Sequence, residues 1–204
     1  MKLHRLRDRL KASTRAAVLQ AAERVFAEQG AGARMEDLAA AAGVAVGTLY
    51  NYFTDRDALL EDLLTARRRE LWAALKEAQR ALPPRASEER LLAFLTALLD
   101  HLRAHWDLFT LILLDDDTTG RPRLARRRSM GAELHARLAE LTDACIDDGV
   151  FDPSAADLYP SMLLGMVKGV VVQHMREHRE PPPHATAARI ARVFARGARR
   201  RTRR

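Results

Sequence analysis

The residues best suited to chemistry lie close together, between positions 46 and 53. Hydroxyl, amide and unobstructed backbone groups, without any charge, come from Gly47, Thr48, Tyr50, Asn51 and Tyr52. On a helix, Val46, Leu49 and Phe53 fall at i, i+3 and i+7 and form one buried stripe, with the hydrogen-bonding groups on another side. Base edges in the major groove of DNA are read by such groups, and asparagine suits adenine N6 and N7. The run therefore indicates a helix that reads a nucleic acid.

The residues before this run predict a second short helix that would hold it. In RMEDLAAAAGVAVGTLYNYFTDR (residues 34–56), Leu38, Ala39 and Ala42 share one face of the earlier helix. Gly43 follows and supplies the residue that tolerates a positive φ in a tight turn between helices. Two short helices joined in this way are typical of a helix-turn-helix. An ordinary corner of two helices is the alternative, which the polar groups on the outer face of the second helix disfavour.

The same segment resembles a known family. GVAVGTLYNYF followed by TDRDALLEDLL is similar to the DNA-binding signature of the TetR (tetracycline-repressor-like) family. The similarity covers about the first quarter of the chain, and beyond it only the helix pattern agrees. The resemblance implies a transcriptional regulator without enzymatic activity or cofactor, which binds a double-stranded DNA operator as a homodimer and responds to a small-molecule effector.

The resemblance also implies which residues meet DNA. Thr48, Tyr50 and Tyr52 stand where the family touches DNA, and Arg56 stands at its basic position. The family usually opens its second helix with a threonine. Arg34 is found in that region here. Either a charged contact from Arg34 replaces the contact between the threonine hydroxyl and a phosphate, or this contact is absent. Tyr50 has a second interpretation as a partly buried core residue. The expected DNA-binding set is Arg34, Val46, Gly47, Thr48, Tyr50, Asn51, Tyr52 and Arg56.

Composition favours an all-α protein with an anionic partner. The 204 residues are 48% hydrophobic and 30% charged, with a formal net charge of +7. Alanine, leucine, arginine and glutamate dominate, and these residues favour helix. Cys145 is the single cysteine, so a disulfide within the chain is excluded and a cytoplasmic setting is expected. The basic start lacks the apolar region of a signal peptide, and Lys168 interrupts the longest apolar run, so no membrane span is expected.

Start and stop signals predict two parts. Residues 1–55 form a helix-turn-helix domain that includes a basic arm at 1–11. The arm has two interpretations: it contacts phosphates or a minor groove, or it is a solvated tail. Ser13 or Thr14 is expected to cap the first helix. Residues 56–204 form a larger helical effector-binding and dimerisation domain, with capping boxes predicted at Thr54-x-x-Asp57 and Ser154-x-x-Asp157. Its helices are expected at 56–80, 87–105, 106–114, 124–148, 155–180 and 185–197, with a loop at 115–123.

Small residues four apart, Gly165 and Gly169, predict a close helix crossing. In the family the last two long helices form the four-helix bundle of a dimer, and the helices at 155–180 and 185–197 occupy that place. A crossing inside one chain is the alternative. The expected dimer interface is Gly165, Gly169, Val170, Ile190 and Phe194.

An effector pocket is implied by the resemblance alone. Residues that could line it are mostly apolar, with methionine and aromatic side chains that adapt to varied ligands. They could equally fill the core. The set is Phe94, Leu98, His101, Trp106, Phe109, Leu113, Leu134, Met162 and Met166.

The histidine pairs His101/His105 and His174/His178 have the i, i+4 spacing of zinc ligands, but no carboxylate or cysteine completes either set in the sequence. No metal site is therefore expected. No phosphate loop, nucleophile elbow or paired carboxylates indicate an enzyme. The prediction is a dimeric, ligand-responsive repressor, released from a palindromic operator by a hydrophobic effector. The alternatives are a non-specific structural DNA-binding protein and a metal-responsive regulator that uses the histidine pairs. The operator, the target genes and the effector are not determined by the sequence.

Overall fold

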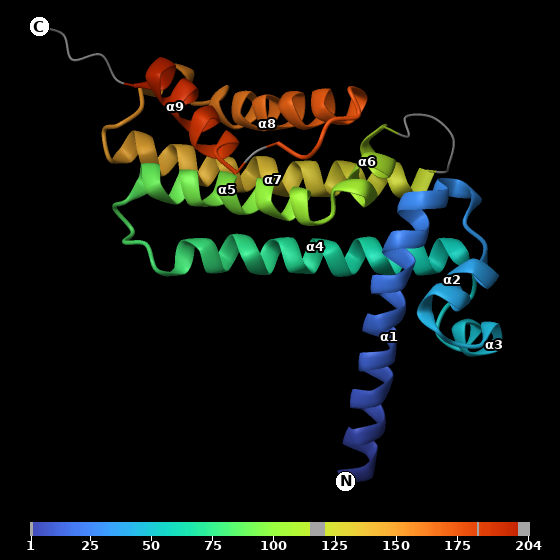
Figure 1. The fold of residues 1–204 in the computed structure, drawn as a ribbon. Helices are drawn as coiled ribbons and strands as arrows, with labels where there is room; N and C mark the ends of the chain where they lie inside the picture. Colours follow the sequence, from blue (N-terminus) through green and yellow to red (C-terminus); the bar gives the residue numbers. More distant parts are fainter. Residues whose placement is uncertain (1, 115–120, 183, 200–204) are drawn as a thin grey trace, which may run out of the picture. The chain divides into compact units, whose positions relative to one another are not determined.

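The computed structural model describes residues 2–114, 121–182 and 184–199. Its described part is helical, as predicted, and its only extended pairing is one bridge between Phe151 and Arg199. Two short 3-10 turns, η1 and η2, cover Gly30–Gly32 and Pro153–Ala155. The α-helices are α1 (Lys2–Gln29), α2 (Met35–Ala42), α3 (Val46–Tyr50), α4 (Arg56–Arg80), α5 (Ser87–Ala104), α6 (Trp106–Leu114), α7 (Arg121–Asp147), α8 (Tyr159–Arg176) and α9 (Thr186–Ala198) (Figure 1).

Several helix ends differ from the sequence prediction. The expected basic arm is helical, because α1 begins at Lys2 and runs past Ser13 and Thr14, which therefore do not cap it. The segment contains neither glycine nor proline and is rich in leucine, lysine and arginine, which are good helix formers. Part of the expected loop at 115–123 also belongs to a helix, since α7 starts at Arg121, while 115–120 lie outside the described residues.

Two predicted capping boxes were wrong in detail. The carboxylate that caps α4 belongs to Asp55, whose Oδ1 accepts from the Ala58 amide at 2.7 Å, so the cap is one residue later than Thr54. Before α8, Asp152 accepts from the Ser154 amide at 2.8 Å and caps η2, not a long helix. α8 itself begins only at Tyr159.

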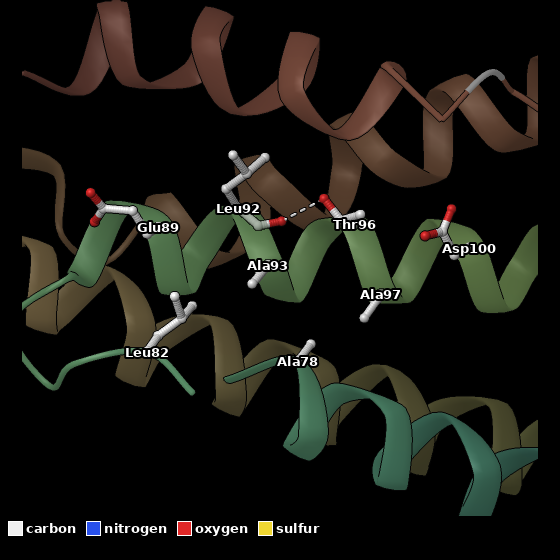
Figure 2. A pocket seen from close by; sticks show the side chains of 8 residues that line it. All are labelled: Ala78, Leu82, Glu89, Leu92, Ala93, Thr96, Ala97 and Asp100. Carbon is white, nitrogen blue, oxygen red and sulfur yellow. Dashed lines mark hydrogen bonds between the residues drawn. The ribbon is translucent and has the colours of Figure 1, made fainter. Parts of the chain in front are cut away.

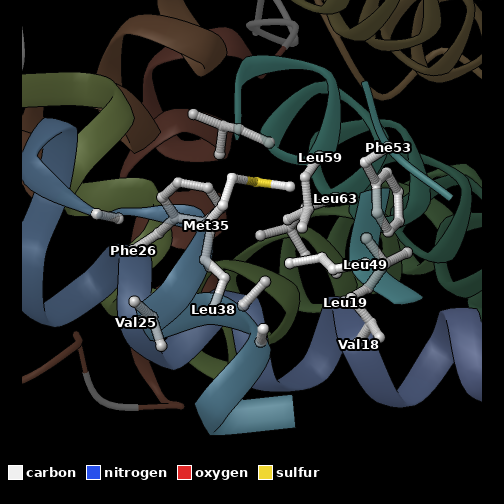
Figure 3. Packing of buried hydrophobic residues seen from close by; sticks show 14 of the residues in the cluster. Val18, Leu19, Val25, Phe26, Met35, Leu38, Leu49, Phe53, Leu59 and Leu63 are labelled. Carbon is white, nitrogen blue, oxygen red and sulfur yellow. The ribbon is translucent and has the colours of Figure 1, made fainter. Parts of the chain in front are cut away.

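The chain separates into two compact units, Met1–Glu70 with Asp107–Ile112, and Leu71–Trp106 with Leu113–Arg204. The first unit therefore extends beyond residue 55, and α4 starts in the first unit and ends in the second. Its core joins α1, α2, α3, the start of α4 and Leu108 of α6 (Figure 3). Leu38, Leu49 and Leu59 are completely buried there. This core packs against the buried side of α3 and fixes the helix in the first unit.

Charged pairs fasten α1 to α4 within the first unit. Arg67 is only 13% exposed and donates to Glu23 of α1 through Nε at 2.8 Å, while its Nη1 donates to Glu70 at 2.7 Å. Arg15 and Asp62 form a second ion pair between the same helices. Because Arg67 is largely desolvated, its pair should contribute more to the position of α1 than an exposed one would.

The second unit is a packed set of antiparallel and crossing helices. α7 packs against α5 and α8, and α9 packs against α5 and α8. Phe151, Tyr159 and Phe194 meet edge to face, with ring centroids 5.4–5.7 Å apart. This aromatic cluster joins the start of α8 to α9 and to the turn after α7.

Among the residues that the structure describes, no helix is both long enough and apolar enough to cross a membrane.

Candidate nucleic-acid interface

The turn between α2 and α3 has the geometry that its sequence predicts. Gly43 lies in the left-handed region at φ 66° and ψ 29° and ends α2. Its amide donates to the Ala39 and Ala40 carbonyls, and the Val44 amide donates to Ala39 O at 3.0 Å. A side chain at this φ is strained, so glycine is required for this tight connection. The turn sets the angle at which α3 leaves the core.

α3 buries one side and offers the other to solvent. Leu49 and Phe53 are 0% and 3% exposed, and they anchor the helix in the core of the first unit. Tyr50 is 51% exposed, which supports its interpretation as a surface residue and not a core residue. The remaining members of the predicted set divide by burial: Gly47 and Asn51 are exposed, Thr48 is half-buried, and Val46 and Tyr52 are partly buried against the core.

The two arginines of the predicted set are each held side-on by an aspartate. Arg34, at the N-cap of α2, donates from Nε to Asp37 Oδ2 at 3.2 Å and from Nη2 to Asp37 Oδ1 at 3.5 Å. Arg56, the first residue of α4, donates from Nε and Nη2 to Asp57 Oδ1 at 3.1 and 2.8 Å.

Both pairs occupy the same edge of the guanidinium group. Arginine has five donors in a planar fork, so the side-on carboxylate of Asp37 leaves Nη1 and the outer edge of Arg34 for a second acceptor such as phosphate. The hydrogen bond and charge of Arg34 lower the pKa of Asp37. The carboxylate therefore stays ionised near neutral pH and continues to hold the arginine.

The family comparisons agree with this geometry. Residues 18–63, which run from α1 through the start of α4, match the model of the bacterial regulatory proteins of the tetR family. The chain therefore carries the DNA-binding domain of the TetR family. The match covers the helix-turn-helix, α2 and α3, and supports a DNA-binding regulator.

Solved TetR-family structures share the fold over nearly the whole chain. A TetR transcription regulator from Haloarcula marismortui superposes with a TM-score of 0.79 at 20% identity, over 93% of this chain and 100% of that one. The fatty acid degradation regulator FadR from Bacillus halodurans gives 0.75 at 21%, over 90% and 99%. The ketosteroid regulator KstR2 of Mycobacterium tuberculosis gives 0.69 at 20%, over 92% and 95%. At this identity the likeness shows the fold alone. No curated protein matches the sequence.

The glycine pair of α8 faces outward. Gly165 and Gly169 of α8 are exposed, and a Cβ built on either one meets nothing within 4 Å. A close crossing inside the chain would have placed another helix against them. Val170 is half-buried beside them, and Leu158, Met162 and Val193 are 52%, 50% and 63% exposed.

Two residues of the predicted dimer set belong instead to the core of the subunit. Ile190 and Phe194 are 5% and 4% exposed, and Phe194 packs against Phe151 and Tyr159. They lie on the inner face of α9, while Val193 lies on its outer face. The i, i+4 spacing of Leu158 and Met162, followed by Gly165 and Gly169, is the signal that would have located the outward stripe in the sequence.

The residues predicted for the effector pocket belong to both compact units and differ in burial. Phe94, Leu98, His101 and Leu134 are buried in the second unit, where Trp106 and Met166 are half-buried. Phe109 is buried in the first unit, Met162 is on the surface, and the side chain of Leu113 lies outside the described residues. The His101 and His105 rings lie 4.7 Å apart, and the described residues contain no group of three potential metal ligands.

Proposed function

We propose that this protein is a ligand-responsive transcriptional repressor that binds a palindromic operator as a homodimer and leaves it when a small effector binds. The observation that carries the proposal is the outward face of α3. It combines an exposed tyrosine, an exposed asparagine and an exposed glycine, with no charge between residues 46 and 53, on a helix anchored by Leu49 and Phe53.

In the proposed interface, some residues contact base edges and others contact phosphates. Tyr50 and Asn51 would meet base edges in the major groove, and Gly47 would let the backbone approach closely. Arg34 would give the outer edge of its guanidinium group to a phosphate, with Asp37 on the opposite edge, and Arg56 would contribute positive charge at the start of α4. Val46, Thr48 and Tyr52, which are partly buried, would fix the depth of the helix. Residues 1–55 would form the part of the chain that meets DNA.

The proposed dimer uses the outward face of α8 and α9. A stripe of exposed apolar and small residues, Leu158, Met162, Gly165 and Gly169, runs along α8, and Val193 is exposed on α9. Exposed apolar groups arranged in a stripe favour contact with another protein surface. The same stripe on a second copy would give an isologous interface, which brings two recognition helices to the two halves of a palindrome.

The effector would act by its differential affinity for two states of the dimer. A loss of operator affinity of about 100-fold requires about 2.7 kcal/mol of coupling. α4 is a single helix that contributes residues to both compact units, so it provides a continuous element through which residues 56–204 could act on the DNA-binding unit.

The test is footprinting of the purified protein on the DNA upstream of its own gene, with excess non-specific competitor. We expect a protected palindrome whose half-sites lie about one helical turn, roughly 34 Å, apart. Diffuse coating that is lost with salt and shows no site would overturn the proposal in favour of non-specific DNA binding. Protection of a site by a monomer at its full affinity would overturn the dimeric part alone.

A further inference from the structure

A groove in the second unit lies between the end of α4 and one face of α5. On α5 it is lined by Leu92, Ala93, Thr96 and Ala97, between Glu89 at one end and Asp100 at the other (Figure 2). Ala78 of α4 and Leu82 of the following turn form the facing wall. The α5 residues recur at i, i+3, i+4, i+7, i+8 and i+11, so a single helical stripe forms the floor.

The groove is hollow because its walls are built from small side chains. Alanines at 78, 93 and 97 leave a space of about 420 Å³, within the usual range for a small-molecule site. Glu89 and Asp100 are eleven residues apart on α5, which corresponds to about 16 Å along the helix. The groove is therefore an apolar trough with one carboxylate at each end.

Every polar side chain that lines the groove is a hydrogen-bond acceptor. The Thr96 hydroxyl donates its proton to the Leu92 carbonyl at 2.9 Å, so it can only accept from a ligand. Asp100 Oδ1 lies 2.7 Å from His184 Nδ1, and the Asp100 side chain is 43% exposed. Glu89 is exposed at the other end.

The nearest arginines of α5 are engaged by backbone carbonyls. Arg90 Nη1 donates to Pro84 O at 3.4 Å, and Arg103 Nη1 donates to Pro181 O at 3.2 Å and also to Pro182 O. None of the lining residues is basic. The residues that line the groove thus offer no donor and no positive charge to a ligand's anionic group, and the one imidazole beside them, that of His184, is engaged by Asp100.

We propose that this groove binds a small amphiphilic cation, with its apolar body on the alanines and leucines and its positive charge beside Glu89 or Asp100. A carboxylate-bearing ligand such as a free fatty acid is disfavoured, because it would find no donor and would be repelled by both carboxylates. The inference names the effector class of the proposed regulator, and its regulatory consequence rests on that proposed function. Binding of the cation does not depend on it.

The probe is tetraphenylphosphonium, with neutral triphenylphosphine oxide as the uncharged comparison, and binding to the full-length protein is measured by isothermal titration calorimetry. The test variant Glu89→Gln/Asp100→Asn removes both groove carboxylates. The control Glu77→Gln/Asp143→Asn removes two exposed carboxylates that do not line the groove, so both variants have the same net charge.

We expect wild type and control to bind the cation with dissociation constants within about twofold of each other, and the test variant to bind at least about tenfold more weakly. The neutral oxide should bind more weakly than the cation to wild type. Equal cation binding by the two double variants would overturn the site, and equal binding of oxide and cation to wild type would overturn the ligand class.

Two further measurements keep the outcome interpretable. If Glu89→Gln/Asp100→Asn is unfolded by circular dichroism, the single variant Glu89→Gln, at an exposed position, replaces it with an expected weakening of about threefold. Operator binding is measured on the same wild-type preparation. If the protein binds an operator but not the cation, only the proposed cation site is overturned. If it binds the cation but no specific operator, only the proposed regulatory function is overturned.

Discussion

The outward glycines of α8 lead to a prediction in which subunit stability and dimer stability respond differently. Nothing within 4 Å of the subunit would meet a Cβ at Gly165, which is exposed in the middle of a helix. Gly165→Leu should therefore cause no clash inside its own subunit. A better helix former at this position should stabilise the isolated subunit by up to about 1 kcal/mol.

The effect on the dimer should have the opposite sign. Extra side-chain volume in a closely packed contact costs about 1–3 kcal/mol. An isologous interface contains the change twice, so the dimer should lose roughly 2–6 kcal/mol, which raises the dissociation constant at least about 30-fold. Sedimentation equilibrium over a range of protein concentrations measures the dimer, and urea unfolding at concentrations where the subunit is monomeric measures the subunit.

Gly131→Leu is the matched control, because Gly131 of α7 is also a helical glycine with open space around a built Cβ. It should leave the dimer unchanged. A Gly165→Leu protein that dimerises like wild type would show that this face of α8 meets solvent and not a second copy. Destabilisation of the monomeric subunit by the same substitution would show that the glycine packs inside the chain.

Three further predictions concern single side chains. Tyr50→Ala should abolish operator binding in fluorescence anisotropy while thermal unfolding and the dimer stay unchanged, because the side chain is 51% exposed; full-strength binding would remove α3 from the interface. Asp37→Asn should strengthen operator binding and steepen its salt dependence by about one unit of slope, since the charge of Arg34 is no longer neutralised by a neighbouring carboxylate; weaker binding would instead show that Asp37 positions the arginine. Burial raises the pKa of the Cys145 thiol from its ordinary 9.0 to about 11. Between these two values the folded chain therefore keeps a thiol proton that the unfolded chain releases. Urea unfolding should show stability falling between pH 9 and 11, and Cys145→Ala should remove that part of the slope.

Much of the fold could be predicted because its signals are local. The start of α4 at Arg56, its end near Pro83 and the extent of α6 follow from caps, prolines and apolar spacing. Gly43 likewise determines the turn before α3 by its backbone freedom alone. One error occurs where two possible caps stand side by side. Asp55 took the place of Thr54 because its carboxylate reaches the Ala58 amide.

The side chains of the interface were only partly predictable. Polar character marked Tyr50, Asn51 and Gly47 as an outer face, but the sequence did not say that Val46 and Tyr52 are partly held by the core. The pairing of Arg34 with Asp37 was visible as opposite charges three residues apart, although its side-on geometry was not. Such geometry depends on how each side chain leaves the helix.

What the sequence determined by itself is the helix-turn-helix and the all-α class, because both depend on contacts between residues that are near in the chain. The tertiary structure alone decided which faces of α8, α9 and α5 remain open. Ile190 and Val193 lie three residues apart on α9 and have similar apolar side chains, yet one is 5% and the other 63% exposed. Their difference arises from the helices packed on one side of α9. The acceptor-lined groove likewise exists only because the end of α4 and the turn after it lie beside α5, so both features require surfaces that distant segments create together.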